Sequence, residues 1–211
     1  MKIRATDAFI GVDLQNDFVS SSGEIPVPHG EAVIGVVNYC LAAFPITILT
    51  QDWHPRGHVS FASSHDGGAV GMQLGDQLLW PDHCIQGTWG ALLSSDVEED
   101  RAQLILRKGF RRGLDSYSAF VEQDRMTTTG LAGYLRERGV ARVFVAGLAT
   151  DFCVGETALG AAAAGFTTYL VADGCQEVNF NGSGPAMGKR LFAAGIRTVI
   201  SDDLEPFSAQ I

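Results

Sequence analysis

The chain has 211 residues, of which 46% are hydrophobic and 18% charged, so it can bury a full-sized core. Its formal net charge of −9 excludes the basic surface that nucleic-acid binding requires. The sequence lacks the bulky apolar run of a membrane span, and Asp7 and Asp13 interrupt the first apolar stretch before it could act as a secretion signal. With four cysteines and no CxxC spacing, we expect reduced thiols and a cytoplasmic protein without membrane or nucleic-acid partners.

The first half of the chain alternates strand-type and helix-type patterns. A compact apolar run at residues 8–12 predicts a strand covered on both faces. Residues 30–44 carry apolar side chains on one helical stripe and predict a helix. Strands are predicted at residues 46–49 and 104–106. Between them, residues 51–95 are rich in Gly, His, Trp and Asp and show little periodicity, and so long a connection inside a compact domain is usually functional.

The second half continues the alternation. A helix containing Leu131 and Leu135 is predicted to follow a cap within residues 127–129 and to end at Gly139. Strand and helix patterns then alternate at residues 142–146, 153–164, 167–171, 185–194 and 197–200. Such repetition implies right-handed crossovers between parallel strands. We therefore predict a single α/β domain over residues 1–211, with a mainly parallel sheet and helices on both faces.

Each of four predicted strands is followed by a reactive side chain: Asp13, Asp52, Lys108 and Cys153. In open parallel sheets, ligands bind beyond the carboxyl ends of the strands. We therefore expect these four side chains to converge on one edge of the sheet from distant positions in the sequence.

Cys153 lies where a predicted strand turns into a helix. A helix N-terminus lowers a thiol pKa and can bind an oxyanion, so Cys153 is a candidate nucleophile. The alternative, a buried cysteine acting as a small apolar residue, suits Cys40 on its helical stripe better. Asp13 and Lys108 would supply an acid/base and a cation beside the thiol, although a purely structural salt bridge is the alternative for this pair.

Four of the five histidines fall within one irregular stretch: His54, His58, His65 and His83. On extended backbone, Asp52 and His54 point the same way and can reach one metal ion. Two imidazoles and one carboxylate leave coordination positions open, as catalytic sites do. We expect one divalent transition metal ion per chain, for which zinc, iron, manganese and nickel are all suited. His65, and His29 outside the stretch, are expected to lie away from the metal.

Seven motifs occur in a characteristic order: VDLQNDF at 12–18, DWHP at 52–55, GHVSF at 57–61, WPDHCIQGTWG at 80–90, KG at 108–109, DSYSAF at 115–120 and GLATDFCV at 147–154. Together they resemble the nicotinamidases, also called pyrazinamidases, of the isochorismatase-like cysteine hydrolase superfamily. DWHP and WPDHC are the specific part, because the Asp, Lys and Cys arrangement alone identifies only the superfamily. The resemblance covers about residues 7–173.

The resemblance implies hydrolysis of nicotinamide, and of pyrazinamide, to the acid and ammonia through a cysteine thioester, in NAD salvage. It implies a catalytic triad and a set of metal ligands: Asp13, Lys108 and Cys153 for the triad, and Asp52, His54 and His83 for the metal, with zinc, iron or manganese bound. Some members use a further ligand in the GHVSF region, so His58 and Ser60 stay candidates for that role.

The resemblance also implies an oxyanion hole and a substrate pocket. Leu148–Ala149 matches the point where the family has a non-proline cis peptide, which directs the N–H groups of Ala149 and Cys153 toward the substrate oxygen. Aromatic side chains line the family's substrate pocket at three matching positions: Phe18, Trp80 and Tyr117. Core packing is the alternative role for each of these rings.

Three alternatives stay open from the sequence. The first is another amidohydrolase of the superfamily, which would generally lack the metal ligands. The second is a non-enzymatic metal-binding or interaction protein with an inert Cys153. The third is a catalytically inactive regulator with the same fold, against which the intact triad argues. The sequence leaves open whether the chain forms a homo-oligomer.

Overall fold

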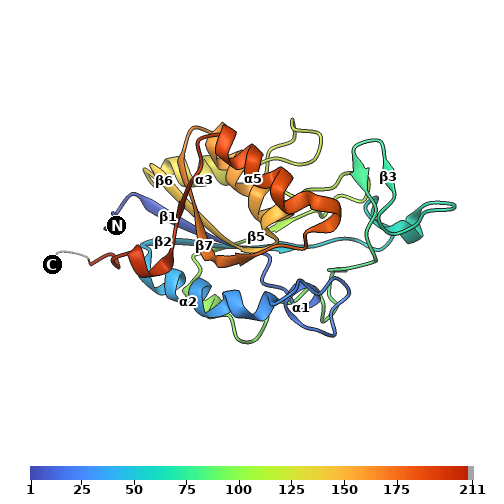
Figure 1. The fold of residues 1–211 in the computed structure, drawn as a ribbon, viewed down its shortest axis with the longest axis horizontal. Helices are drawn as coiled ribbons and strands as arrows, with labels where there is room; N and C mark the ends of the chain where they lie inside the picture. Colours follow the sequence, from blue (N-terminus) through green and yellow to red (C-terminus); the bar gives the residue numbers. More distant parts are fainter. Residues whose placement is uncertain (209–211) are drawn as a thin grey trace.

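The computed structural model describes residues 1–208, in which a six-stranded sheet lies between layers of helices (Figure 1). All neighbouring strands are parallel, in the spatial order β5-β2-β1-β6-β7-β8. Their bounds are Asp7–Val12 for β1, Ile46–Asp52 for β2, Leu104–Lys108 for β5, Arg142–Leu148 for β6, Thr167–Gln176 for β7 and Arg197–Val199 for β8. A small hairpin, β3 (Gln73–Leu74) and β4 (Gln77–Leu78), stands apart from the sheet.

Five α-helices and several short helical turns connect the strands in residues 1–208. The helices are α1 (Asn16–Val19), α2 (Ile34–Ala43), α3 (Leu131–Glu137), α4 (Gly155–Ala163) and α5 (Ser183–Ala193). Single 3-10 turns occur at Gly30–Val33, Ala62–Ser64, Glu99–Arg101, Phe180–Gly182 and Ser201–Asp203, and one π-type turn at Thr150–Val154. None of the helices in this part of the chain is long and apolar enough to cross a membrane.

The sheet has a hydrophobic core on each face. Along β1, Phe9 lies in one core cluster with Val37 and Cys40 of α2. Ala8 and Ile10 lie in the opposite cluster, to which α3, α4 and α5 contribute. This alternation follows from the two-residue repeat of a strand. The predicted fold class, a parallel sheet with helices on both faces, is confirmed, and Cys40 is a buried core residue as expected.

Several strands are longer than predicted. β2 continues to Asp52 and β5 to Lys108, whereas apolar runs alone predicted ends at residues 49 and 106. The polar extensions are possible because Asp52 and Lys108 are opposite each other in the parallel ladder. Paired polar residues therefore extend the sheet where apolar burial no longer does.

The helix boundaries also differ from the prediction. The helix predicted for residues 30–44 begins as a 3-10 turn, and only Ile34–Ala43 is α-helical. The helix predicted from Cys153 begins at Gly155, so Cys153 lies in the π-type turn before it. The N-cap of α3 is Gly130, so the cap predicted within residues 127–129 is wrong by one residue, although the Thr129 hydroxyl accepts the Leu131 N–H at 3.2 Å.

The irregular segment at residues 51–95 folds back on itself. A parallel bridge pairs His54 with Ile85, and a second one pairs Phe61 with Trp80. The His54 N–H donates to the Cys84 carbonyl at 3.0 Å. Because of this return path, His83 comes to lie beside His54 although 29 positions separate them in the sequence.

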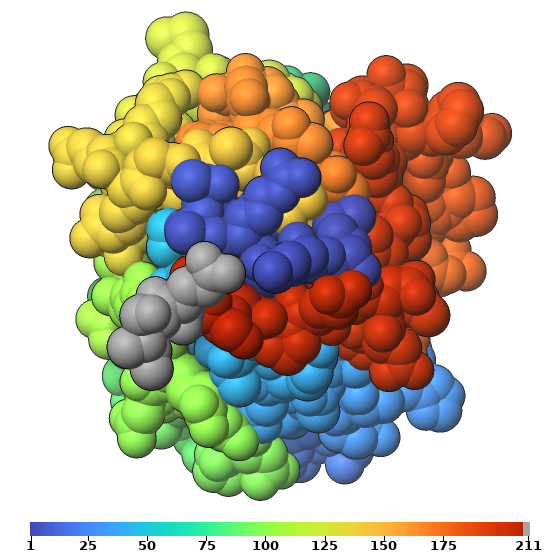
Figure 2. Space-filling model, turned by 90° about the vertical axis from the view of Figure 1, so that its left-hand side faces the viewer, coloured from blue at the N-terminus to red at the C-terminus, as the bar shows by residue number. Residues whose placement is uncertain are grey.

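The first residues of the chain lie beside Glu205 at the amino ends of the strands. Figure 2 shows the first residues beside the last described ones on one face. The Ile3 N–H donates to the Glu205 carbonyl at 3.1 Å, and the Glu205 N–H donates to the Met1 carbonyl at 2.9 Å. On the same face, Arg142 Nε donates to Asp7 Oδ1 at 2.7 Å. The opposite edge, where the strands end, carries the reactive side chains.

Candidate active site

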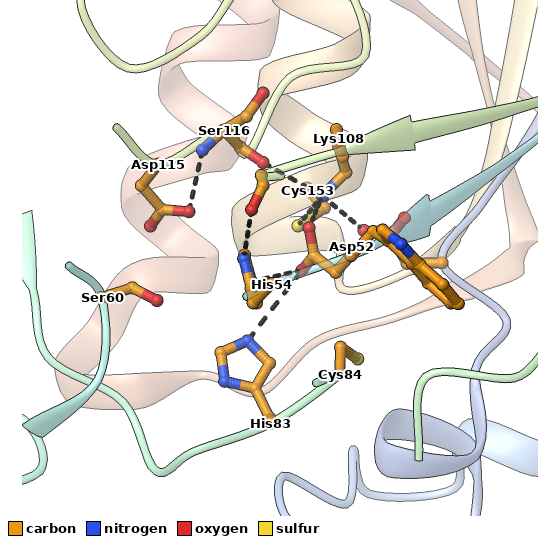
Figure 3. Close-up of polar contacts among 12 residues, drawn as sticks. Asp52, His54, Ser60, His83, Cys84, Lys108, Asp115, Ser116 and Cys153 are labelled. Carbon is orange, nitrogen blue, oxygen red and sulfur yellow. Dashed lines mark hydrogen bonds and ion pairs between the residues drawn. The ribbon is translucent and has the colours of Figure 1, made fainter. Parts of the chain in front are cut away.

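Three of the predicted catalytic side chains meet at the carboxyl edge of the sheet. Lys108 Nζ lies 2.8 Å from Asp13 Oδ2. It also donates to Cys153 Sγ at 3.2 Å (Figure 3). Thr50, on β2, donates its hydroxyl to the other carboxylate oxygen of Asp13. Asp13, Lys108 and Cys153 are 0%, 1% and 6% exposed, so these charges interact with little screening by water. The prediction that these side chains converge on one edge of the sheet from separate strands is therefore confirmed.

Local backbone geometry places each of these groups. Asp13 has a φ of 53°, in the left-handed region, where the chain turns away at the end of β1. Lys108 is the last residue of β5. The peptide between Leu148 and Ala149 is cis, as the resemblance implied, and the Val154 N–H donates to the Ala149 carbonyl at 3.1 Å. The thiol-bearing turn thus begins directly at the end of β6.

Burial determines the charge state of the thiol. Burial raises the pKa of Cys153 well above its ordinary value, and the nearby Lys108 ammonium lowers it only in part. The sequence predicted a lowered thiol pKa from the helix N-terminus, but the direction is the opposite, because loss of hydration outweighs the cation. Burial also raises the pKa of Asp13, against the opposing effect of Lys108. Lys108 itself keeps a raised pKa because the carboxylates of Asp13 and Asp52 outweigh its burial.

Asp52 joins this cluster to the histidines. Its Oδ1 accepts a hydrogen bond from Lys108 Nζ at 2.6 Å. Its Oδ2 lies 3.6 Å from His54 Nε2 and 4.0 Å from His83 Nε2 (Figure 3). Burial alone would raise the pKa of Asp52, but the Lys108 ammonium and His54 hold it well below its usual range. The carboxylate is therefore ionised. One of its oxygens faces Lys108, and the other faces the two histidines.

The donor atoms of Asp52, His54 and His83 fit a metal ion. They lie within 4.8 Å of one another, and all three residues are buried. His54 Nδ1 lies 2.8 Å from the Gly109 carbonyl, and His83 Nδ1 lies 2.8 Å from the Pro81 carbonyl. A carbonyl only accepts, so each Nδ1 carries a proton, and Nε2 is the nitrogen that lies beside Asp52. A metal ion would bind each ring through Nε2 in its neutral form, with the Nδ1 proton held by the carbonyl.

His58 has a different environment. Its ring is stacked on the His54 ring, with centroids 4.1 Å apart and planes 26° apart, whereas the His54 and His83 rings are 73° apart. Nearly parallel, stacked rings are less well oriented than the His54 and His83 rings for directing in-plane lone pairs at one ion. His58 Nδ1 instead forms a 2.7 Å hydrogen bond with Ser60 Oγ. The geometry favours His83 over His58 and Ser60, although His58 also shares a buried group with His54 and Asp115.

The other two histidines lie apart from this group. His65 Nε2 forms a 2.8 Å hydrogen bond with the Val59 carbonyl. His29 is exposed in a turn with a φ of 57°. Neither belongs to the clusters whose donor atoms could hold an ion in residues 1–208, as the sequence predicted.

An apolar cavity lies next to the thiol. Its walls include the three rings predicted from the resemblance, together with Cys153, Asp52 and His83: Phe18, Trp80 and Tyr117. Trp80 Nε1 donates to Tyr117 Oη at 2.8 Å, so these two rings hold each other in place. Phe18 packs against His83 with ring centroids 5.7 Å apart.

Several residues that complete the site were not predicted from the sequence. Phe152 lines the cavity, and its ring meets the edge of Trp80 at 5.0 Å. The buried carboxylate of Asp151 accepts the N–H groups of Val178 and Asn179, and Val178 is also part of the cavity wall. Phe152 and Asp151 stood within the GLATDFCV motif, so proximity to Cys153 was the available indication.

The fold and this arrangement define an α/β protein with a buried cysteine and a metal-suited group at the carboxyl edge of a parallel sheet. The isochorismatase domain matches residues 7–201 of the chain. The nicotinamidase of Acinetobacter baylyi is 43% identical over 208 residues, which cover 97% of each chain. The chain belongs to the isochorismatase family.

Two solved structures extend the comparison. A nicotinamidase and pyrazinamidase of Acinetobacter baumanii has a TM-score of 0.91 at 43% identity, over 95% of this chain and 98% of that chain. The pyrazinamidase of Pyrococcus horikoshii in complex with zinc has a TM-score of 0.77 at 35% identity, over 92% of this chain and 99% of that chain. The chain is thus similar to these proteins along nearly its whole length.

Proposed function

We propose that this chain is an amidohydrolase that converts nicotinamide to nicotinate and ammonia, and accepts pyrazinamide, in NAD salvage. The observation that carries the proposal is that Cys153 shares one apolar cavity with Asp52 and His83 of the metal-suited group. An aromatic amide with a ring nitrogen could place its amide at Cys153 and its ring nitrogen at the metal-suited group. The nicotinamidases and pyrazinamidase that the chain resembles support this assignment.

Acylation would begin with the thiol. Asp13 takes the proton of Cys153, and the sulfur attacks the carboxamide carbon. The N–H groups of Ala149 and Cys153 stabilise the resulting oxyanion. Asp13 then passes the proton to the departing nitrogen, ammonia leaves, and a thioester to Cys153 remains. The raised pKa of Asp13 suits a carboxyl that holds a proton between two transfers.

Deacylation would use the same groups in reverse. Asp13 removes a proton from a water molecule, whose oxygen attacks the thioester carbon. The tetrahedral intermediate collapses to nicotinic acid, which ionises to nicotinate, and the Cys153 sulfur recovers the proton from Asp13. Lys108, within 3.2 Å of both groups, stabilises negative charge on either one.

Asp52, His54 and His83 would hold one divalent transition metal ion in this proposal. Zinc is supported by the zinc complex of the Pyrococcus horikoshii relative, and iron or manganese suits the same donors. When bound, such an ion supplies an open position for the ring nitrogen and thereby orients the amide over sulfur. A cytoplasmic location accords with four free cysteines.

Ammonia release from nicotinamide tests the proposal directly. Purified protein should release one ammonia per nicotinate formed, should lose this activity on chelation, and should recover it when zinc is restored. Isochorismate is the control substrate, since the superfamily alternative predicts turnover there. No ammonia from nicotinamide, with or without added metal, would refute the proposed function.

A further inference from the structure

The side chain of Gln15 occupies the place of a missing backbone partner of Asp52. β1 pairs with β2 as far as Gly11, which lies opposite Leu49. The chain then leaves the ladder at Asp13, whose φ is 53°. β2 continues for three residues beyond Leu49, so the peptide groups of Asp52 extend past the end of its neighbour. A buried peptide group in that position requires another hydrogen-bond partner.

The Gln15 amide supplies this partner with both of its ends. Gln15 Oε1 accepts the Asp52 N–H at 2.7 Å, and Nε2 donates to the Asp52 carbonyl at 2.8 Å. The second Nε2 proton goes to the Ala91 carbonyl at 2.9 Å. On the other side of the strand, the Trp53 N–H donates to the Lys108 carbonyl at 2.9 Å. The end of β2 is therefore held from both sides.

These contacts leave the Gln15 amide a single orientation. Exchange of its oxygen and nitrogen would place a donor against the Asp52 N–H and an acceptor against two carbonyls. Gln15 is fully buried, so water cannot replace a lost contact. The Asp52 backbone is thereby fixed at the position from which its Oδ2 faces His54 and His83.

We infer that Gln15 is a positioning residue of the metal site, acting through the backbone of Asp52 without touching the ion. The inference rests on the metal ligands of the proposed function. Groups that hold a ligand in place typically change metal affinity by about 10-fold to 100-fold when they are removed. Gln15 contacts the backbone of one ligand at both of its polar groups, so a loss in this range is expected on its substitution.

The test compares two glutamine variants in the full-length chain. Gln15→Met keeps the length of the side chain but removes its donors and acceptor. Gln51→Met is the matched control, because Gln51 Nε2 donates to the same Ala91 carbonyl at 3.1 Å. The dissociation constant for zinc is measured by competition with a chromophoric chelator. We expect zinc binding about 10-fold to 100-fold weaker in Gln15→Met, with activity restored at saturating zinc.

Binding in Gln51→Met should stay within about twofold of the parent chain. Far-UV circular dichroism of the metal-free proteins separates weaker binding from loss of fold. If Gln15→Met fails to fold, Gln15→Glu is the second variant. Its carboxylate still accepts the Asp52 N–H but cannot donate to the Asp52 and Ala91 carbonyls, so it should also bind zinc more weakly.

Three outcomes are decisive. Equal zinc affinity in the parent chain and a folded Gln15 variant would overturn the inference. An equal loss in the Gln51 and Gln15 variants would also overturn it, because the effect would then belong to the Ala91 contact. Failure of the parent chain to bind zinc would instead refute the proposed metal site.

Discussion

Lys108 Nζ donates to Asp52 Oδ1 at 2.6 Å, so the proposed triad and the proposed metal site share one ion pair. A substitution of Asp52 would therefore remove a metal ligand and also change the charge beside Lys108. Variants of His83 separate the two effects better, because His83 faces Oδ2, the other oxygen of the Asp52 carboxylate.

Cys153→Ala should reduce ammonia release from nicotinamide by at least about a thousandfold, because the proposed covalent step has no other nucleophile. Metal content and the circular dichroism spectrum should not change. Cys40→Ala is the matched control, since Cys40 is a fully buried core residue of α2. Activity near that of the parent chain in Cys153→Ala would exclude the thioester mechanism.

His83→Ala should lose the metal ion, of which metal analysis of the parent chain should find about one per chain. The reason is that His83 supplies one of the three buried donor groups that lie within reach of a single ion. His65→Ala should keep the full amount, because His65 bonds to the Val59 carbonyl outside the group. Stoichiometric metal in His83→Ala would show that the third ligand was assigned wrongly, and His58 would become the candidate.

The sequence predicted the fold and the convergence of the reactive side chains because both depend on local pattern and topology. Apolar runs located the strands, and the parallel arrangement brought Asp13, Lys108 and Cys153 to one edge. The charge state of the thiol could not be predicted in this way. It depends on how completely Cys153 is buried, which the neighbouring loops determine.

A side chain that hydrogen-bonds in place of a neighbouring strand could also not be predicted from the sequence. Gln15 lies within the VDLQNDF motif, yet only the structure shows that its amide bonds to the peptide groups of Asp52. The Lys108 contact to Asp52 was missed for a related reason. The strands were predicted to end before their polar residues, so a pairing of Asp52 with Lys108 inside the sheet was not expected.

Acid should destabilise the metal-free protein between about pH 6.5 and pH 4. Burial, together with the charge of His54, lowers the pKa of His58 and that of His83 to about 4. Between these pH values, His58 and His83 are protonated in the unfolded chain but not in the native chain. Their contribution to the free energy of unfolding is therefore complete above the unfolded pKa of about 6.5 and is lost as the pH falls toward 4. His54 has a raised pKa and contributes with the opposite sign, so its contribution is lost as pH rises.

His58→Gln isolates this effect. Thermal unfolding midpoints of the metal-free variant should fall less steeply between pH 7 and pH 4.5 than those of the parent chain. The corresponding difference in the free energy of unfolding, relative to pH 7, is on the order of 1–3 kcal/mol at pH 4.5. Parallel curves for the two proteins would contradict the lowered pKa of His58.

Asp151→Ala should raise the KM for nicotinamide about tenfold and lower the free energy of unfolding by about 2–4 kcal/mol. The buried Asp151 carboxylate accepts the Val178 N–H at 3.0 Å and the Asn179 N–H at 2.7 Å, and it also accepts the Ser183 hydroxyl. Without the Asp151 carboxylate, Val178 in the cavity wall is no longer hydrogen-bonded to the turn that carries Cys153. Ser183→Ala removes one of the three contacts and should show the smaller change in urea unfolding and steady-state kinetics.

The kinetics of the Asp151 variant also test the assignment. Because Asp151 is proposed to hold the cavity wall and not to take part in the chemistry, kcat at saturating substrate should change by less than about threefold. A loss confined to kcat, with KM unchanged, would contradict this role.

Four related amides test how the substrate ring is recognised. Nicotinamide and pyrazinamide both carry a ring nitrogen meta to the carbon that bears the amide, so both should be substrates. Benzamide has the same shape without that nitrogen and should react far more slowly. Picolinamide carries the nitrogen at the adjacent position, which displaces the carbonyl from Cys153, and a displacement of about 1 Å can reduce the rate on the order of a hundredfold.

The measurement is kcat/KM for the four amides with the metal-loaded enzyme, with isochorismate as a separate control. The cavity beside Cys153 is lined mainly by apolar side chains, and Asp52 and His83 of the metal-suited group are among its few polar ones. Discrimination among rings of one size should therefore come from the nitrogen position. Equal kcat/KM for benzamide and nicotinamide would exclude the metal site from substrate recognition, and turnover of isochorismate alone would assign the chain to a different reaction of its family.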